Sequence, residues 1–285
     1  GSNTESWISR NTLEFHPDFT DMLADWLHNE QVQPWCRIRA AENLQNAPGM
    51  NQQHPFAPAY LFGTGIVPLE NYPFRGVIWY QGESNAEKID QHEKLLTCLV
   101  DDWRSFLDNQ ELPFYYVQLS SLNRETWSEF RDSQRRLMTQ IPYAGMAVTS
   151  DIGHPTDVHP RNKKDVGQRL SLWALARTYD QPVVYSGPLY RSMEIKNNKI
   201  RLYFDHTGSG LSTPGNQNPV GFEIAEEDRV YLPARVKISK EHVVLSGKGM
   251  SHPRYVRYAW EPYTQANLIN KEGLPASSFT TERQK

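Results

Sequence analysis

The sequence has little of three features that would each assign it to a familiar class. It has only 2 cysteines in 285 residues, so no disulfide framework defines the fold, and Cys36 and Cys98 could either pair or stay reduced. Its longest apolar runs, such as residues 76–80, have the length of a strand and not of a membrane span. Lys and Arg total 30 against 33 Asp and Glu, without a basic block. We therefore expect neither a nucleic-acid nor a membrane partner.

The hydrophobic residues up to about residue 180 alternate between two periods. Short apolar runs of strand length are separated by stripes with helical spacing. Repeats of this kind predict an α/β fold, with a parallel sheet and helices on both of its faces. The predicted strands are 76–81, 114–119 and 147–149, the predicted helices include 19–27, 96–107, 127–138 and 166–174, and 42–58 is predicted as a loop.

The pattern of apolar residues changes near residue 181. Residues 193–196 and 199–202 flank Asn197 and Asn198, a pair typical of a two-residue hairpin turn. Further short strands are expected at 222–224, 235–238 and 242–245. The sequence therefore predicts an α/β domain over residues 1–180 and a β-rich C-terminal domain over residues 181–285.

Polar loops follow each of the three predicted strands of the α/β domain. They cover residues 81–86, 118–123 and 150–160. The first contains Gln81, Glu83 and Asn85, and the second begins with Gln118. In parallel sheets, ligands bind at the carboxyl ends of the strands. These loops are therefore the first place to look for a site.

His159 is the strongest single candidate in these loops. A histidine titrates at about pH 6.5, so it can take a proton from a hydroxyl group and return it to a leaving group. It needs a carboxylate to fix its tautomer, and Asp157 lies two residues earlier in the same loop. The alternative is that these acids and histidines only cap the helix that follows.

The same loop also allows a metal interpretation. Asp151, His154, Asp157 and His159 are four potential ligands of a divalent ion within nine residues. They follow no fixed metal-site spacing, so we rank this interpretation second and expect no cofactor.

Ser84 is a candidate nucleophile by its surroundings. Residues 82–86 approximate the Gly-X-Ser-X-Gly turn after a strand, although the last position is Ala86. The alternative, which we favour, is that Ser84 caps a helix beginning near Glu87.

The sequence Gly-Val-Ile-Trp-Tyr-Gln-Gly-Glu-Ser-Asn-Ala at 76–86 closely resembles the sialate O-acetylesterase family, a group of SGNH-type hydrolases. The resemblance is strongest at 157–170, which begins Asp-Val-His-Pro-Arg-Asn. It covers most of the chain in the family's order. The other similar segments are 113–119, 145–149, 256–260 and 267–279, with 270–276 the best match among these four.

This resemblance implies a three-layer, flavodoxin-like domain and a set of roles. His159 would be the general base and Asp157 its orienting acid, although the spacing is one residue shorter than the Asp-X-X-His usual in SGNH enzymes. Asn85 would donate a hydrogen bond to the oxyanion, a contribution of about 3 kcal/mol to the barrier. Glu83 is the rival for the acid's role. Gln81 and Gln118 are predicted to contact the substrate.

The family's nucleophilic serine belongs to a Gly-Gln-Ser-Asn-Met block, which does not occur in residues 1–285. Residues 1–10 are similar instead to the family's second block, in which Gly1 would give a backbone N–H to the oxyanion hole. We therefore expect the first strand and the nucleophile upstream of this chain, or on a second polypeptide.

The resemblance implies an esterase that removes O-acetyl groups from sialic acid or a related acetylated sugar by serine-type acyl transfer. It also suggests a periplasmic or secreted location, although no signal peptide is visible. Two alternatives remain: a non-catalytic carbohydrate-binding protein, and a metal-dependent hydrolase that uses the 151–159 loop.

Overall fold

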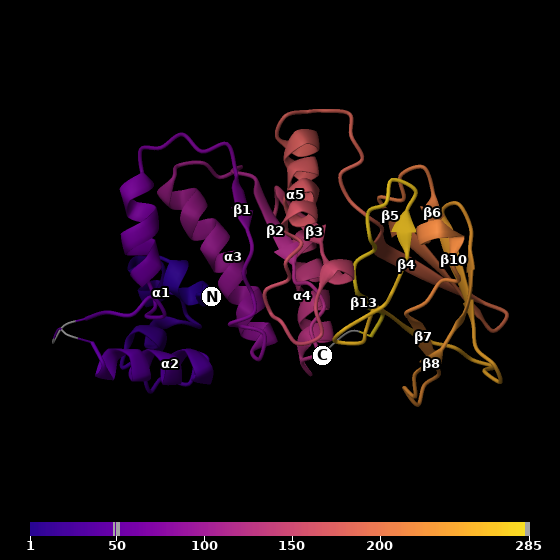
Figure 1. Cartoon of the computed structure of the whole chain (residues 1–285), viewed down its shortest axis with the longest axis horizontal. Helices are drawn as coiled ribbons and strands as arrows, with labels where there is room; N and C mark the ends of the chain where they lie inside the picture. Colours follow the sequence, from indigo (N-terminus) through magenta and orange to yellow (C-terminus); the bar gives the residue numbers. More distant parts are fainter. Residues whose placement is uncertain (48, 50–51, 283–285) are drawn as a thin grey trace. The chain divides into compact units, whose positions relative to one another are not determined.

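The computed structural model describes residues 1–47, 49 and 52–282 (Figure 1). The chain forms two compact units. Unit 1 comprises Gly1–Phe114 and Thr139–Ala144, and unit 2 comprises Tyr115–Met138 and Gly145–Lys285. No helix in the described residues is both long enough and apolar enough to cross a membrane.

Unit 1 is mostly helical, and local chemistry fixes where its helices begin. Ser9 caps the first α-helix by accepting a hydrogen bond from the N–H of Thr12 at 3.1 Å. Pro34 opens the second, at a position where an N–H would have no partner within the helix. With η denoting short 3-10 or π helices, the helices are η1 Thr4–Trp7, α1 Arg10–Phe15, η2 Thr20–Leu23, α2 Pro34–Gln45, η3 Phe62–Ile66, η4 Val67–Leu69 and α3 Ile89–Phe106.

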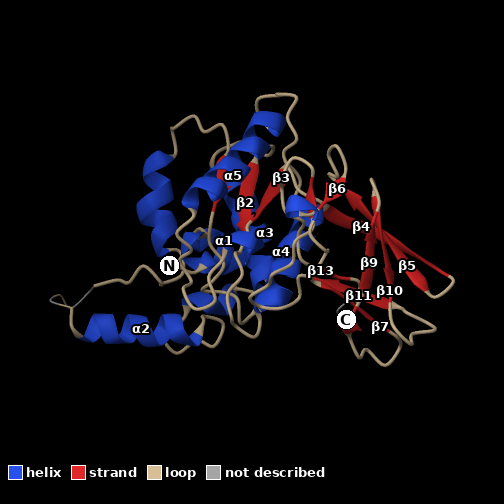
Figure 2. Cartoon of the chain, turned by 45° about the vertical axis from the view of Figure 1, so that its right-hand side comes forward, coloured by secondary structure: helices blue, strands red, loops and turns tan. Residues whose placement is uncertain are grey.

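Strands and helices alternate along the chain from β1 to α5, as the periodicity predicts. Three strands form a sheet in the order β1-β2-β3. This confirms the α/β class, and Figure 2 distinguishes these helices in blue from the strands in red. The elements after β1 Val77–Trp79 and α3 are β2 Phe114–Gln118, α4 Trp127–Gln140, β3 Ala144–Val148, η5 Ser150–Ile152 and α5 Lys163–Arg177.

A tryptophan cluster anchors the start of the chain in unit 1. The ring of Trp7 lies 5.9 Å from that of Trp79 and 6.3 Å from that of Trp103. The indole N–H of Trp103 also donates to the carbonyl of Trp7 at 2.8 Å. Aromatic edges packed on faces favour one arrangement of the rings, so residues 1–9 are held beside β1 and α3.

The part of unit 2 after residue 188 is a β-sandwich. One sheet has the order β4-β5-β10-β9, the other β13-β11-β7-β8, and a short pair is formed by β12 and β6. Alternating residues such as Ile200, Leu202 and Phe204 on β5 point into a core shared with Ile224 and Val256. The elements are β4 Leu189–Lys196, β5 Lys199–Asp205, β6 Leu211–Ser212, η6 Pro214–Asn216, β7 Phe222–Ala225, β8 Leu232–Pro233, β9 Arg235–Ile238, β10 His242–Ser246, β11 Tyr255–Tyr258, β12 Ile269–Asn270 and β13 Phe279–Thr280.

The predicted hairpin is confirmed in detail. Lys196 pairs with Lys199, and Asn197 and Asn198 have φ angles of 48° and 55°. Two successive positive φ angles are the geometry of a type I′ turn, in which Asn is favoured because its short side chain tolerates this region.

Two secondary-structure predictions near the start are wrong. Residues 19–27 form η2 and turns in place of one helix, because Asp25 has a φ of 40°, which no right-handed helix accepts. Helix α2, ending at Gln45, enters the predicted loop 42–58, of which residues 48, 50 and 51 lie outside the described part.

The boundary at 180/181 coincides with a change in secondary structure but not with the division into compact units. Unit 2 joins α5 and most of α4 to the β-sandwich. Arg131 of α4 makes one such connection: it is fully buried and donates to the carbonyls of Ala259, Glu261 and Pro262 at 2.7 to 2.9 Å. Burial also lowers the pKa of this guanidinium to about 9.

Candidate active site

The turn after β1 carries four of the candidates, and it is almost entirely buried. Gln81 is 8% exposed, Ser84 2% and Asn85 2%, and Glu83 is half-buried. Ser84 does not cap the following helix, contrary to the prediction, because α3 begins only at Ile89 and Lys88 is its N-cap residue.

Asn85 is the centre of a hydrogen-bond network in this turn. Its Oδ1 accepts from the N–H of Thr4 at 3.0 Å and from Nε2 of Gln81 at 2.8 Å, and it lies 3.1 Å from Oγ1 of Thr4, whose one hydrogen it shares with Oε1 of Gln81. Its Nδ2 donates to Oε2 of Glu5 at 2.9 Å. A backbone N–H can only donate, so the orientation of the amide is fixed. Nδ2 has two hydrogens, and Glu5 is its one acceptor among the described residues.

Glu5 is a site residue that sequence reasoning missed. Its carboxylate is fully buried and accepts from Nδ2 of Asn3 at 2.6 Å as well as from Asn85. Burial raises the pKa of Glu5, and hydrogen bonds to its own backbone, to Asn85 and to Asn3 oppose that rise. An acidic residue two positions before Trp7, within the segment similar to the family's second block, was the available signal.

Gln81 links the start of the chain to the turn. Nε2 donates to the carbonyl of Ser2 at 2.9 Å, and Oε1 accepts from Oγ1 of Thr4 at 2.9 Å. A carbon atom added at Gly1 would lie 3.8 Å from Oγ of Ser84, which places Gly1 against the same turn. The amide of Gln81 thus has internal partners, and its predicted contact with the substrate stays a prediction.

The loop after β3, in unit 2, carries four further candidates. Oδ1 of Asp157 accepts from the backbone N–H of His159 at 2.9 Å and lies 4.0 Å from its ring Nδ1. The side chains of His159 and Asp157 are 77% and 45% exposed. The carboxylate thus stands beside the imidazole, at a distance longer than a hydrogen bond.

The metal interpretation of this loop finds no support in the geometry. Asp151 forms a two-pronged ion pair with Arg169 at 2.6 and 2.7 Å. Nδ1 of His154 accepts from the backbone N–H of Asp157 at 3.0 Å. In the described part of the chain, no three His, Cys, Asp or Glu side chains are gathered so that they could hold a metal ion.

Close packing holds this loop in place. A carbon atom added at Gly153 would lie 2.1 Å from the carbonyl oxygen of Ser121, so only glycine fits. The N–H of His154 donates to that carbonyl at 3.2 Å, and Oγ of Ser121 donates to the carbonyl of Ser150 at 2.6 Å. Hydrogen bonds therefore connect the loop after β2 to the loop after β3, a few residues before His159.

Gln118, at the end of β2, is in the interior. It is 0% exposed, and its Nε2 donates to the carbonyl of Arg131 at 2.7 Å and to Oγ of Ser277 at 2.9 Å. Its side chain therefore has no exposed surface in this structure, and its predicted contact with the substrate stays a prediction.

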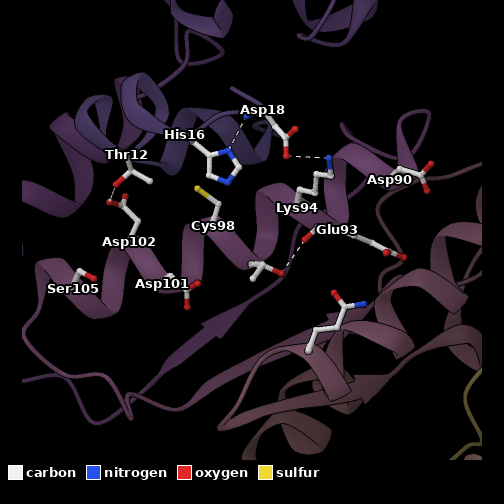
Figure 3. A pocket seen from close by; sticks show the side chains of 12 residues that line it. Thr12, His16, Asp18, Asp90, Glu93, Lys94, Cys98, Asp101, Asp102 and Ser105 are labelled. Atoms are coloured by element: carbon white, nitrogen blue, oxygen red, sulfur yellow. Dashed lines mark hydrogen bonds and ion pairs between the residues drawn. The ribbon is translucent and has the colours of Figure 1, made fainter. Parts of the chain in front are cut away.

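A cavity of about 830 Å3 lies along α3 in unit 1, lined by none of the predicted site residues (Figure 3). Two of its acidic side chains already have internal partners. Asp102 accepts from the N–H and the hydroxyl of Ser9, and Asp18 pairs with Lys94 at 2.9 Å. Cys98, on this wall, and Cys36 are both buried and unpaired.

A known protein family matches the part of the chain that contains these loops. The model of the family described as "Carbohydrate esterase, sialic acid-specific acetylesterase" matches residues 66–175. The match includes the turn after β1, the loop after β2 and the loop with Asp157 and His159.

Individual proteins extend the similarity to the whole chain. The sialate O-acetylesterase of Mus musculus is 28% identical over 99% of this chain, and that of Homo sapiens is 28% identical over 79%. A crystal structure of a carbohydrate acetylesterase from Xanthomonas citri superposes over 100% of the chain, with 31% identity and a TM-score of 0.80. The chain spans 58%, 49% and 59% of the lengths of these three proteins.

Proposed function

Because this chain belongs to the sialate O-acetylesterase family of carbohydrate esterases, we propose that the whole protein removes O-acetyl groups from sialic acid or a related acetylated sugar. The reaction would be serine-type acyl transfer, in which the acetyl group passes through an ester with the enzyme before water releases it.

One observation carries the proposal. A single family match, over residues 66–175, includes both the turn with Asn85 and the loop with Asp157 and His159. The two segments have complementary chemistry, since one supplies an amide donor and the other a base with a neighbouring carboxylate. Acyl transfer needs both functions.

In this proposal, His159 takes the proton from the serine hydroxyl as that oxygen attacks the acetyl carbon. The proton then passes to the sugar oxygen as the ester bond breaks, and His159 activates water in the second half of the cycle. The exposure of the imidazole supports this role, because the ring can reach both a nucleophile and a leaving group.

Asn85 would donate the second hydrogen of Nδ2 to the oxyanion, while Glu5 keeps the first. The oxygen of this amide accepts from the N–H of Thr4 and from Gln81, which holds the amide in the preorganised orientation that an oxyanion site requires. The backbone N–H of Gly1, beside the same turn, would be a second donor.

Two carboxylates compete to orient His159. Asp157 stands 4.0 Å from the ring Nδ1, and a rotation of the exposed imidazole would bring the two into hydrogen-bond distance. Glu83, in the Asn85 turn, is the rival. We propose Asp157 as the orienting acid because it lies on the same loop as the base.

The experiment is turnover of p-nitrophenyl acetate and of an O-acetylated sialic acid by the whole protein, with and without EDTA. The proposal requires hydrolysis that resists EDTA and is abolished by a fluorophosphonate. Mass analysis should then locate the adduct on a serine other than Ser84, which is only 2% exposed. The Ser84→Ala variant should hydrolyse both substrates like the wild type.

Each alternative has its own outcome in this experiment. Loss of turnover with EDTA would support the metal-dependent hydrolase. A folded whole protein that binds the acetylated sugar but neither hydrolyses it nor takes up the fluorophosphonate would support a non-catalytic carbohydrate-binding protein. A stoichiometric adduct on Ser84 would make the turn after β1 the nucleophile site.

A further inference from the structure

The β-rich part of unit 2 contains a separate cavity of about 280 Å3. It lies at the start of β7 and along the loop that follows β11. No residue predicted for the active site lines it. Its walls combine an indole ring, two carboxylates, an amide and a hydroxyl, from Glu223, Trp260, Glu261, Thr264 and Gln265.

Strand alternation places Glu223 on the side of the cavity. In the β7–β11 pair, Ile224 is opposite Val256, and both are fully buried in the sandwich core. Neighbouring residues point to the other face, where Glu223 stands directly opposite Arg257. The carboxylate is half-buried; burial raises its pKa, and the proximity of Arg257 opposes that rise by favouring the charged form.

The loop that forms the opposite wall is held firmly. The carbonyls of Ala259, Glu261 and Pro262 all accept from the buried guanidinium of Arg131. At the other end of the loop, a carbon atom added at Gly221 would lie 2.4 Å from Cβ of Ala266, so the loop packs directly on the backbone before β7. The cavity is therefore preformed, as a binding site for a small ligand usually is.

The polar groups of the cavity still have bonding capacity. Among the described residues, neither the carboxylate of Glu223 nor that of Glu261 receives a hydrogen bond. The guanidinium carbon of Arg257 lies 5.5 Å from the centre of the Trp260 ring and 3.4 Å from that of Tyr231, so the cation lies near both rings. An aromatic surface beside available acceptors can bind a ligand that is apolar on one face and carries hydroxyls at its edge.

We propose that this cavity binds one neutral pyranose ring. The ring would pack its C–H face against Trp260 and donate hydroxyl hydrogens to Glu223 and Glu261, with Gln265 as a further partner. The volume is just below that of pockets for larger organic ligands, about 300 Å3 and above, which suits a single sugar.

Charge selects among the ligands that fit this shape. The two carboxylates against one guanidinium repel an acidic sugar. A cationic amine would be repelled by Arg257, whose guanidinium already lies near both Trp260 and Glu223. A neutral sugar has neither conflict. The proposal does not depend on the esterase site, because no residue of that site takes part.

The test is titration of the full chain with methyl β-D-galactopyranoside and methyl α-D-glucopyranoside, followed by calorimetry and by saturation-transfer NMR. We expect saturable binding of at least one of them, weakened by about tenfold or more in Trp260→Ala and in Glu261→Gln. The matched controls Tyr179→Ala and Glu241→Gln remove an exposed aromatic ring and an exposed carboxylate elsewhere in unit 2 and should bind like the wild type.

Three results would overturn the proposal. One is the absence of saturable binding of both pyranosides. Another is unchanged binding in Glu261→Gln, a surface substitution that does not threaten folding and therefore remains informative if Trp260→Ala fails to fold. The third is tighter binding of N-acetylneuraminic acid or of tetramethylammonium than of either neutral sugar at this cavity.

Discussion

The side-chain amide of Asn85 donates to the carboxylate of Glu5 at 2.9 Å, across 80 positions of sequence. Both side chains are buried, and the carbonyl end of the same amide accepts from Thr4 and Gln81. The residue that we propose as an oxyanion donor therefore also ties the start of the chain to the turn after β1. A substitution of Asn85 affects both functions, so experiments must separate them.

Glu5 should make stability depend on pH. Burial raises its pKa above the usual 4.5, so the folded protein retains the proton where the unfolded chain has lost it. The contribution of Glu5 is then fully present below pH 4.5 and is lost as the pH rises through the folded-state pKa. We predict that the free energy of unfolding of the wild type, minus that of Glu5→Gln, falls as the pH rises above about 4.5, by at most about 1.4 kcal/mol per pH unit.

Urea unfolding of both proteins at a series of pH values measures this difference. Glu87→Gln, which removes an exposed carboxylate from the same turn, serves as the control. A difference between the wild type and Glu5→Gln that stays constant with pH would show that Glu5 is ionised with its usual pKa in the folded protein.

His159→Ala in the whole protein should abolish ester hydrolysis without affecting the fold. Loss of the base of a triad lowers kcat by about a thousandfold or more. The side chain is 77% exposed, so the free energy of unfolding should change by no more than about 0.5 kcal/mol. Turnover of an acetyl ester and urea unfolding measure the two effects, with the exposed His252→Ala as control. Turnover close to that of the wild type would remove His159 from the mechanism.

The choice between Asp157 and Glu83 is a separate prediction. If Asp157 orients the base, Asp157→Asn should lower kcat by about ten-thousandfold, because the neutral amide allows the wrong tautomer. Glu83→Gln should then have a much smaller effect. The reverse order of kcat values would assign the role to Glu83.

The strands and helices from β1 to α5 could be predicted because each is a local pattern. The stripe on α3, for example, appears as buried Leu96, Leu99 and Trp103. The asparagine hairpin turn was equally local. Residues 19–27 were predicted wrongly because helical spacing of apolar residues does not reveal the positive φ at Asp25.

The buried polar groups could not be predicted, because their partners are distant in sequence. Gln118 and Gln81 stand at strand ends, where sequence reasoning expects a ligand, but their amides bind Ser277 and Ser2. Periodicity treats Arg131 as an ordinary polar helix position, although it bonds three carbonyls about 130 residues away. Such pairs become visible only when the fold brings them together.

Arg131→Met should destabilise unit 2 more than most single substitutions. It leaves the carbonyls of Ala259 and Glu261 without their donor, and that of Pro262 with only the N–H of Leu122, at a cost of about 3 kcal/mol or more. Arg131→Lys should recover little, because one ammonium group cannot match the planar guanidinium. The measurements are the urea midpoint and amide exchange over residues 259–266, where exchange should accelerate. Arg177→Met, on the exposed face of α5, is the control. A midpoint equal to that of the wild type would contradict the structural role.

The two functions of Asn85 can be separated by reversing its bond to Glu5. Asn85→Asp keeps the oxygen that accepts from Thr4 and Gln81 but places a second carboxylate oxygen against Glu5, so it should lose about 2 kcal/mol or more of stability. Adding Glu5→Gln gives that oxygen a donor, while the remaining oxygen of residue 5 still accepts from Asn3. The double variant should therefore regain most of the stability, with a coupling of about 1 to 3 kcal/mol.

The activity of the same double variant decides whether Asn85 is an oxyanion donor. Its carboxylate has no hydrogen to give, so kcat should stay about a hundredfold or more below the wild type, with little change in KM, even though the fold is restored. Thermal unfolding and acetyl-ester turnover, measured on the wild type, both single variants and the double variant, give the full cycle. If turnover returned together with stability, Asn85 would serve the fold alone, and the oxyanion would have to be bound by other donors.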